Sequence, residues 1–278
     1  MSTAVQYDHR EKAGNQGDIC KHPALIAAVD ETIARTKHTP FRYADIFAGY
    51  AKNLLPSKGE WSRGIGKIAG QCLGNRNRHV ALWASISGFD RLPCAGAVYP
   101  GSALFAMQVC KRRGKRVELS LWETNREPFK NSRKFFPSVH GVFDRAAKPN
   151  EAAIKNADFV FIDPPDKSKG TWAGILRLLH KLNRSQSVLV WLPIAADTTH
   201  KPPREDKASL KCRMDSLRLG MSASSVRWAN GGRTIGCFAS LSSPCGGPEG
   251  LKRGPGGDRR IGQKRVWKAS CRLELSPF

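Results

Sequence analysis

Two uninterrupted apolar segments constrain the fold of this chain most strongly. The first, FVFI, covers residues 159–162, and the second, SVLVWLPI, covers residues 187–194, with a helical pattern over 173–182 between them. An apolar run without polar alternation is typical of a strand that is covered on both faces, as in a parallel sheet. A strand, a helix and a second strand at this spacing form a βαβ unit. The sequence therefore predicts an α/β fold built on an open parallel sheet.

Other segments carry weaker patterns of the same kind. The residues DICKHPALIAAVDETIAR have helical apolar spacing, with Asp18 as a candidate N-cap and Pro23 tolerable only in a first turn. Alternating apolar residues indicate strands in FRYADIF and RVELSLW. The further elements predicted are, in chain order, a helix over 18–35, a strand beginning at Phe41, a helix over 103–110, a strand over 116–122 and a last hairpin with 234–241 as its second strand.

Composition suggests one α/β domain over residues 1–244, with a probable helical insertion at 52–96 that mixes apolar residues with many Gly and Arg. Residues 245–278 contain Gly, Pro, Arg and Lys with few aliphatics, which predicts a disordered basic tail. No apolar run approaches the roughly 18 residues of a membrane span. The eight cysteines show no C-x-x-C pair, so reduced thiols are expected. We expect a soluble, cytoplasmic monomer.

The charge of the chain is strongly positive. Its 46 Lys and Arg against 23 Asp and Glu give a formal net charge of +23. Such a balance favours a polyanionic partner, because clustered cations attract phosphates at long range. A solvated basic surface in a protein without a nucleic-acid role is the alternative.

Carboxylates follow three of the predicted strands. Asp45 lies at the end of the first with Gly49 just beyond it, Glu123 ends a second, and Asp163 ends a third. In an open parallel sheet, ligands bind beyond the carboxyl ends of the strands. Glu123 could bind the two hydroxyls of a ribose, and Gly49 could allow a cofactor to approach the backbone closely. A turn that merely caps the end of a strand would place Glu123 there equally well.

The segment Asp163-Pro164-Pro165 is a more specific signal. Two prolines fix an extended path and remove two N–H donors, which leaves local carbonyls as acceptors. Carboxylate and carbonyl acceptors that bind the hydrogens of an aromatic amine favour a localised lone pair on its nitrogen. The pattern therefore suits methyl transfer to an exocyclic amine.

Five motifs carry a resemblance to a known family. They occur in the order AGNQGDICKH (13–22), YPGS (99–102), WETN (122–125), IDPPD (162–166) and VWLPI (190–194). In this order and at similar spacing they resemble the RlmJ-type 23S ribosomal RNA adenine-N6 methyltransferases, over roughly residues 7 to 195. The resemblance implies a Rossmann-like class I methyltransferase sheet, S-adenosylmethionine as cofactor and an unpaired or flipped adenine of ribosomal RNA as substrate.

The resemblance also implies roles for individual residues. Asp163 would be the catalytic acceptor for the adenine amino group, and Glu123 would bind the cofactor ribose. The remaining cofactor contacts would be Lys21, His22, Phe47, Gly49, Ser102 and Asp144, and the substrate contacts would be Pro164, Pro165 and Asp166.

Two departures from the family pattern bear on activity. Asp166 stands where the family has a tyrosine that would stack on the target base, and Phe47 stands where it has a polar histidine. Base stacking on an aromatic ring contributes roughly 1–3 kcal/mol. Two alternatives follow: a catalytically altered or inactive relative that still binds nucleic acid, or a protein that acts on DNA, since some members are associated with the use of external DNA. No cluster has metal-ligand spacing, so no metal is expected.

Overall fold

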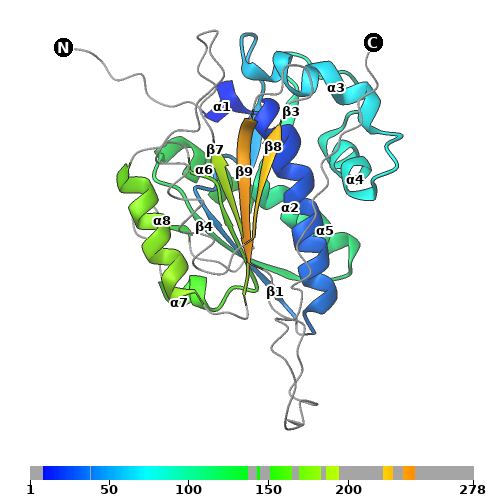
Figure 1. Cartoon of the computed structure of the whole chain (residues 1–278). Helices are drawn as coiled ribbons and strands as arrows, with labels where there is room; N and C mark the ends of the chain where they lie inside the picture. Colours follow the sequence, from blue (N-terminus) through cyan, green and yellow to red (C-terminus); the bar gives the residue numbers. More distant parts are fainter. Residues whose placement is uncertain are drawn as a thin grey trace, which may run out of the picture.

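The computed structural model describes residues 9–37, 39–136, 143–144, 151–164, 169–182, 186–193, 222–227 and 234–241. Its centre is a sheet of seven strands in the order β5-β4-β1-β6-β7-β9-β8 (Figure 1). Strands β5, β4, β1, β6 and β7 are mutually parallel, and β9 runs antiparallel between β7 and β8. The expected α/β fold with a Rossmann-like parallel sheet is confirmed. These strands are β1 (Phe41–Ile46), β4 (Val117–Trp122), β5 (Phe143–Asp144), β6 (Phe159–Ile162), β7 (Ser187–Pro193), β8 (Ser222–Arg227) and β9 (Thr234–Leu241).

Helices cover both faces of this sheet. In Figure 1, α2 and α5 lie on one side of the sheet, and α7 and α8 lie on the other. The helices are α1 (His9–Lys12), α2 (Gln16–Arg35), α3 (Ile65–Cys72), α4 (Arg78–Ser87), α5 (Ser102–Arg112), α6 (Arg126–Phe135), α7 (Glu151–Lys155) and α8 (Lys169–Lys181), with a 3-10 turn, η1 (Glu60–Arg63).

The uninterrupted apolar runs result from this two-sided burial. In β6, Phe159 and Phe161 pack into the core under α2 and α5, whereas Val160 and Ile162 pack into the core under α7 and α8. Side chains of a strand alternate between faces, so a strand buried on both needs apolar residues at every position. The strands predicted at 159–162 and 187–194 are both present.

Helix α2 begins earlier than the sequence predicts. Asn15 is its N-cap, and the Asn15 side chain accepts a hydrogen bond from the backbone N–H of Asp18 at 3.0 Å. Asp18 therefore lies inside the helix, and Pro23 lies in the helix interior rather than in a first turn. The expected N-cap at Asp18 was wrong because an asparagine three residues earlier offers the same capping oxygen.

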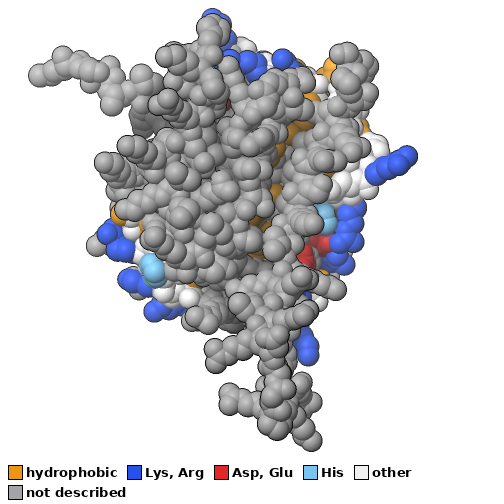
Figure 2. All heavy atoms as spheres, in the orientation of Figure 1, with side chains coloured by type: hydrophobic (Ala, Val, Ile, Leu, Met, Phe, Trp, Pro, Cys, Tyr) orange, Lys and Arg blue, Asp and Glu red, His pale blue; other side chains and the backbone are white. Residues whose placement is uncertain are grey.

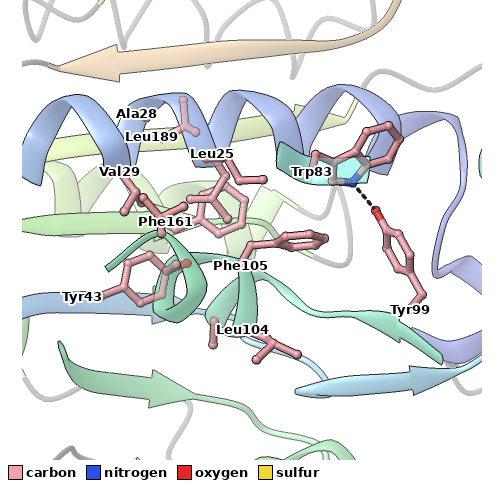
Figure 3. Packing of buried hydrophobic residues seen from close by; sticks show 14 of the residues in the cluster. Leu25, Ala28, Val29, Tyr43, Trp83, Tyr99, Leu104, Phe105, Phe161 and Leu189 are labelled. Carbon is pink, nitrogen blue, oxygen red and sulfur yellow. Dashed lines mark hydrogen bonds between the residues drawn. The ribbon is translucent and has the colours of Figure 1, made fainter. Parts of the chain in front are cut away.

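The segment between β1 and α5 contains η1, α3, α4 and a small antiparallel sheet. That sheet pairs β2 (Lys52–Leu54) with β3 (Val98–Pro100). Trp83 of α4 is fully buried, and its indole N–H donates a hydrogen bond to the Tyr99 hydroxyl at 3.2 Å (Figure 3). Phe105 of α5 packs edge-on against Tyr99, so the segment and the main sheet share one apolar core.

The last two strands form the hairpin expected from the sequence. Strand β9 covers 234–241 and pairs antiparallel with both β8 and β7. The predicted tail over 245–278 lies outside the described residues. Every helix among the described residues is too short or too polar to span a membrane.

Replacement of Phe105 by alanine should destabilise the protein strongly. The Phe105 side chain is fully buried against Tyr99 and His22. Removing a buried phenylalanine costs about 3–5 kcal/mol through lost burial and the cavity left behind. Urea unfolding of Phe105→Ala measures this loss. Leu92→Ala, at a side chain that is 72% exposed, is the matched control and should change the free energy of unfolding by less than about 0.5 kcal/mol. Equal losses in both variants would contradict the assignment of this core.

Candidate active site

A crevice lies at the carboxyl ends of the central strands β1 and β6, where the strand order reverses. Its walls come from the start of α2, the loop after β1, the start of α5 and the segment after β6. It encloses about 80 Å³. The sequence-predicted residues that line it are Lys21, His22, Phe47, Gly49, Ser102, Asp163 and Pro164.

Lys21 forms the central ion pairs of the crevice. Its Nζ lies 2.7 Å from Oδ2 of Asp163 and 2.9 Å from Oδ1 of Asp18. Asp18 is on the same helix, three residues earlier, whereas Asp163 follows β6. The ammonium group therefore joins α2 to the end of the central strand.

The buried charges keep one another ionised. Burial alone would lower the pKa of Lys21, but Asp163 and Asp18 outweigh it and raise that pKa above its usual value. Burial likewise opposes the charge of Asp18, and Lys21 with His22 brings the net pKa of Asp18 below its usual value. Lys21 is thus an ammonium ion at neutral pH, and Asp18 is a carboxylate.

His22 is held neutral behind this ion pair. Burial lowers the pKa of its imidazole to about 4, and its Nδ1 shares a hydrogen bond with the Tyr99 hydroxyl at 2.6 Å. Because Tyr99 also accepts from Trp83, one chain of hydrogen bonds runs from α4 to the wall of the crevice. His22 is 6% exposed, so its role here is that of a packed wall residue with a fixed orientation.

Asp45 lies beneath the floor of the crevice. It is completely buried, and its Oδ2 accepts hydrogen bonds from the Ser102 hydroxyl at 2.6 Å and from the Tyr43 hydroxyl at 2.9 Å. Burial raises the pKa of Asp45 to about 7, against the two hydrogen bonds, and Asp163 and Glu123 add to the rise. Ser102, at the start of α5, is therefore oriented by a carboxyl group of the central strand.

Glu123 lies behind the loop that follows β1. Its Oε2 accepts from the backbone N–H of Gly49 at 3.0 Å, and its Oε1 accepts from that of Asn125 at 2.7 Å. Glu123 is 5% exposed and is not among the lining residues, although Gly49 is. The carboxyl group thus lies one backbone layer from the crevice.

The backbone of this loop and of YPGS is unusual in ways that fit a binding site. Phe47 has φ of 72° and Gly49 has φ of 64°, in the left-handed region that disfavours residues other than glycine. Strain of this kind clusters at functional sites. A Cβ on Gly101 would lie 2.0 Å from the carbonyl oxygen of Tyr50, so only glycine lets α5 begin against this loop.

Three predicted residues have undescribed side chains or positions. Asp144 is in β5, with its Cα opposite that of Trp122, at the same edge of the sheet as Glu123. Its side chain lies outside the described parts. Pro165 and Asp166 fall in 165–168, which is also outside the described residues.

Known proteins resemble this chain in sequence and in fold. No protein-family model matches the chain. The ribosomal RNA large subunit methyltransferase J of Haemophilus influenzae is 22% identical over 246 residues, which cover 80% of this chain and 85% of that protein. The resemblance to the RlmJ-type methyltransferases is confirmed. A solved structure of a Legionella pneumophila protein of the family DUF519 is 17% identical, with a TM-score of 0.63, over 84% of this chain and 86% of that one. The structural likeness shows the fold.

Sequence reasoning missed two residues of the site. A capping role for Asp18 does not predict its ion pair, although the spacing D-x-x-K places it one helical turn before Lys21. Asp45 was noted as a strand-end carboxylate without a role, because its partner Ser102 is 57 residues away in the chain. Within the described residues, no group of three or more His, Cys, Asp and Glu side chains could hold a metal ion.

Asp45→Asn should stabilise the protein at alkaline pH relative to the wild type. The pKa of Asp45 is about 7 in the folded protein and about 4 when unfolded, so the wild type loses stability as pH rises from about 4 to 7. An amide keeps an acceptor for Ser102 and does not ionise. In urea unfolding, the variant should gain about 2–3 kcal/mol on the wild type between pH 5 and pH 8. All other titrating groups are common to both proteins, so a difference independent of pH would contradict the buried carboxyl.

Proposed function

We propose that this chain is an S-adenosylmethionine-dependent methyltransferase that modifies the N6 amino group of an adenine in ribosomal RNA. The observation that carries the proposal is the Asp163-Pro164 segment, which lines the crevice at the switch point of the sheet with Asp163 fixed by Lys21. The similarity to ribosomal RNA large subunit methyltransferase J supports the same reaction. Such a protein acts in the cytoplasm, where bacterial ribosomal RNA is made.

The residues of the crevice fit the proposed cofactor chemically. When bound, S-adenosylmethionine supplies a methyl group activated by a sulfonium cation. Carboxyl groups at the ends of β1, β4 and β6 favour a cation, and Asp45 has a buried oxygen, Oδ1, with no hydrogen-bond partner among the described residues. Glu123 would bind the ribose hydroxyls after exchanging its hydrogen bond to Gly49.

The crevice is small compared with sites that hold a ligand of cofactor size. Pockets that hold drug-sized ligands enclose roughly 300–1,000 Å³, and this crevice encloses about 80 Å³. Cofactor binding therefore requires the walls to separate. The loop around Phe47 and Gly49 is a candidate for this movement, because its left-handed backbone has a lower-energy alternative at Phe47.

Asp163 would act as the acceptor for the target amine. Its side chain is 24% exposed, so it is reachable from the crevice while bonded to Lys21. The contact with the ammonium group restricts the rotation of Asp163, which prepares an acceptor for an N–H of adenine without reorganisation. The carbonyl of Pro164 would accept the second N–H. Correct alignment of amine and methyl group can contribute on the order of 7–11 kcal/mol to the rate.

A basic rim beside the crevice supports an RNA substrate. Lys12 lines both the crevice and a neighbouring hollow. The other lining residues of the hollow include Lys58 and Arg63 together with Glu11 and Glu60, and Glu60 is paired with Lys12. In Figure 2, Lys and Arg side chains appear along the margins of the face shown. The segment between β1 and α5 contributes further cations that we expect to contact phosphates, and all of them are exposed: Lys52, Lys58, Arg63, Lys67, Arg76 and Arg78. Two alternatives are that the chain binds nucleic acid without transferring a methyl group, and that its substrate is DNA. The next experiments distinguish these alternatives from the proposed function.

Asp163→Ala should abolish methyl transfer. Tritiated methyl transfer to unmodified 23S ribosomal RNA and to DNA fragments is measured for the wild type, for Asp163→Ala and for the control Asp158→Asn, which changes a carboxyl group at the other end of β6. We expect transfer to RNA by the wild type and control, loss of at least about 10²-fold in Asp163→Ala, and cofactor affinity within a few-fold.

Each other result has a distinct meaning. Transfer to DNA alone would favour the alternative that the protein acts on DNA. Cofactor binding without transfer to either substrate would favour the inactive relative, and equal rates in Asp163→Ala and wild type would remove Asp163 from the mechanism.

The rim should make RNA affinity depend on salt. Each phosphate contact contributes roughly 0.7–0.9 to the slope of log affinity against log salt concentration. The double variant Lys58→Ala/Arg63→Ala should therefore lower the slope by roughly 1–2. The matched control is Lys111→Ala/Arg112→Ala, at the end of α5 remote from the crevice, and should leave the slope unchanged. Equal changes in both variants would place the RNA elsewhere on the surface.

A further inference from the structure

Asp45 is a buried acid that the proposed reaction does not use. It is the penultimate residue of the central strand β1, with Leu121 of β4 and Phe161 of β6 as its register partners. Two residues beyond those partners lie Glu123 and Asp163, so three carboxyl groups lie at three adjacent strand ends. Asp45 is the most deeply placed of the three, at 0% exposure.

The hydrogen bonds of Asp45 are unevenly distributed. Oδ2 accepts from two hydroxyls, those of Ser102 and Tyr43, whereas Oδ1 is buried and has no hydrogen-bond partner within the described part of the chain. A buried, unpartnered carboxylate oxygen is costly unless a positive charge compensates for it. The structure thus contains an acid that is poorly solvated in its ionised form.

The charged groups around Asp45 give little compensation. Glu123 faces it from β4 and Asp163 from β6, with Tyr43 on its own strand and Ser102 on α5. Helix α2 brings the ammonium of Lys21, already 2.7 Å from Asp163, together with Asp18 and a neutral His22. Among these described groups, three carboxylates stand against one ammonium before Asp45 is counted. Burial, with Asp163 and Glu123, accordingly raises the pKa of Asp45 to about 7.

We propose that Asp45 releases its proton when S-adenosylmethionine enters the crevice, and that this coupling favours the cationic cofactor over its uncharged thioether product. The inference rests on the proposed function. Ser102, which lines the crevice and donates to Asp45, places the carboxyl one side chain from the bound ligand. A sulfonium charge bound in the crevice would lower the free energy of the carboxylate and not that of the acid.

The step balances as an acid dissociation. The O–H bond of Asp45 breaks, the proton passes to the buffer, and no bond forms to the cofactor. The thioether product, S-adenosylhomocysteine, differs from the cofactor by the transferred methyl group, and without it the sulfur carries no positive charge. The product therefore stabilises the carboxylate form of Asp45 less than the cofactor does, and it should leave the site more readily after transfer.

Calorimetric titration of the full chain tests this coupling. Binding of S-adenosylmethionine and of S-adenosylhomocysteine is measured from pH 6 to pH 8 in two buffers of different ionisation enthalpy, which gives the number of protons released. We expect a proton release near pH 6.5–7 for the cationic cofactor and a smaller one for the product. Affinity for the cofactor should rise with pH through about 7 and then level off, by up to about tenfold for each unit by which binding lowers the pKa of Asp45.

Variants identify the group that releases the proton. Asp45→Asn should keep only the pH dependence due to the ligand's own ammonium group and should lose part of the preference for cofactor over product. Asp163→Asn is the matched control, since it removes a neighbouring carboxylate and should keep the proton release at a lower pH. Ser102→Ala removes a donor to Oδ2 and should move the release to a higher pH, which provides a second test if Asp45→Asn does not fold.

The outcomes separate this inference from the proposed function. Unchanged proton release in Asp45→Asn, or a wild type that binds the cofactor without releasing protons, would overturn the coupling and leave the proposed function standing. Absence of cofactor binding at any pH would overturn both.

Discussion

The crevice depends on the position of one ammonium group. Lys21 connects Asp18 within α2 to Asp163 at the end of β6, and these three side chains are largely buried. Removing one partner from a buried ion pair leaves an uncompensated charge, which usually costs more than the pair contributes. The position of α2 against the sheet and the orientation of Asp163 are therefore coupled. The N-cap at Asn15, which sets where α2 begins, determines that Lys21 faces the crevice.

The sequence was most informative where one physical cause acted on consecutive residues. Strands β6 and β7 are covered on both faces, which requires apolar residues at every position, and this pattern predicted the parallel sheet. The strand-end rule for open sheets predicted that Asp163, Glu123 and Gly49 border one crevice. Asp163 and Gly49 line it, whereas Glu123 lies behind Gly49 and is not among the lining residues. Residues just beyond a strand could be predicted as site residues because the apolar pattern shows where each strand ends.

Other parts of the site depend on contacts between distant residues. The pairing of Ser102 with Asp45 and of His22 with Tyr99 joins residues 57 and 77 positions apart, and no local pattern indicates them. The left-handed conformation of Phe47 is also unexpected, because an aromatic residue gives no signal for it. The small sheet of β2 and β3 was missed since each strand has only three residues. Propensity in such short segments is too weak to outweigh their many glycines and arginines.

The chain of hydrogen bonds from Trp83 through Tyr99 to His22 has a consequence for how this protein could change over time. These hydrogen bonds connect α4 to the wall of the crevice through polar groups that are buried in an apolar core. A deletion in the segment between β1 and α5 that displaced Trp83 would remove the hydrogen-bond donor to the buried Tyr99 hydroxyl. It would also leave a cavity beside Phe105. The segment therefore supports the wall of the binding pocket from behind. We expect insertions and deletions in it to be tolerated only at its exposed loops.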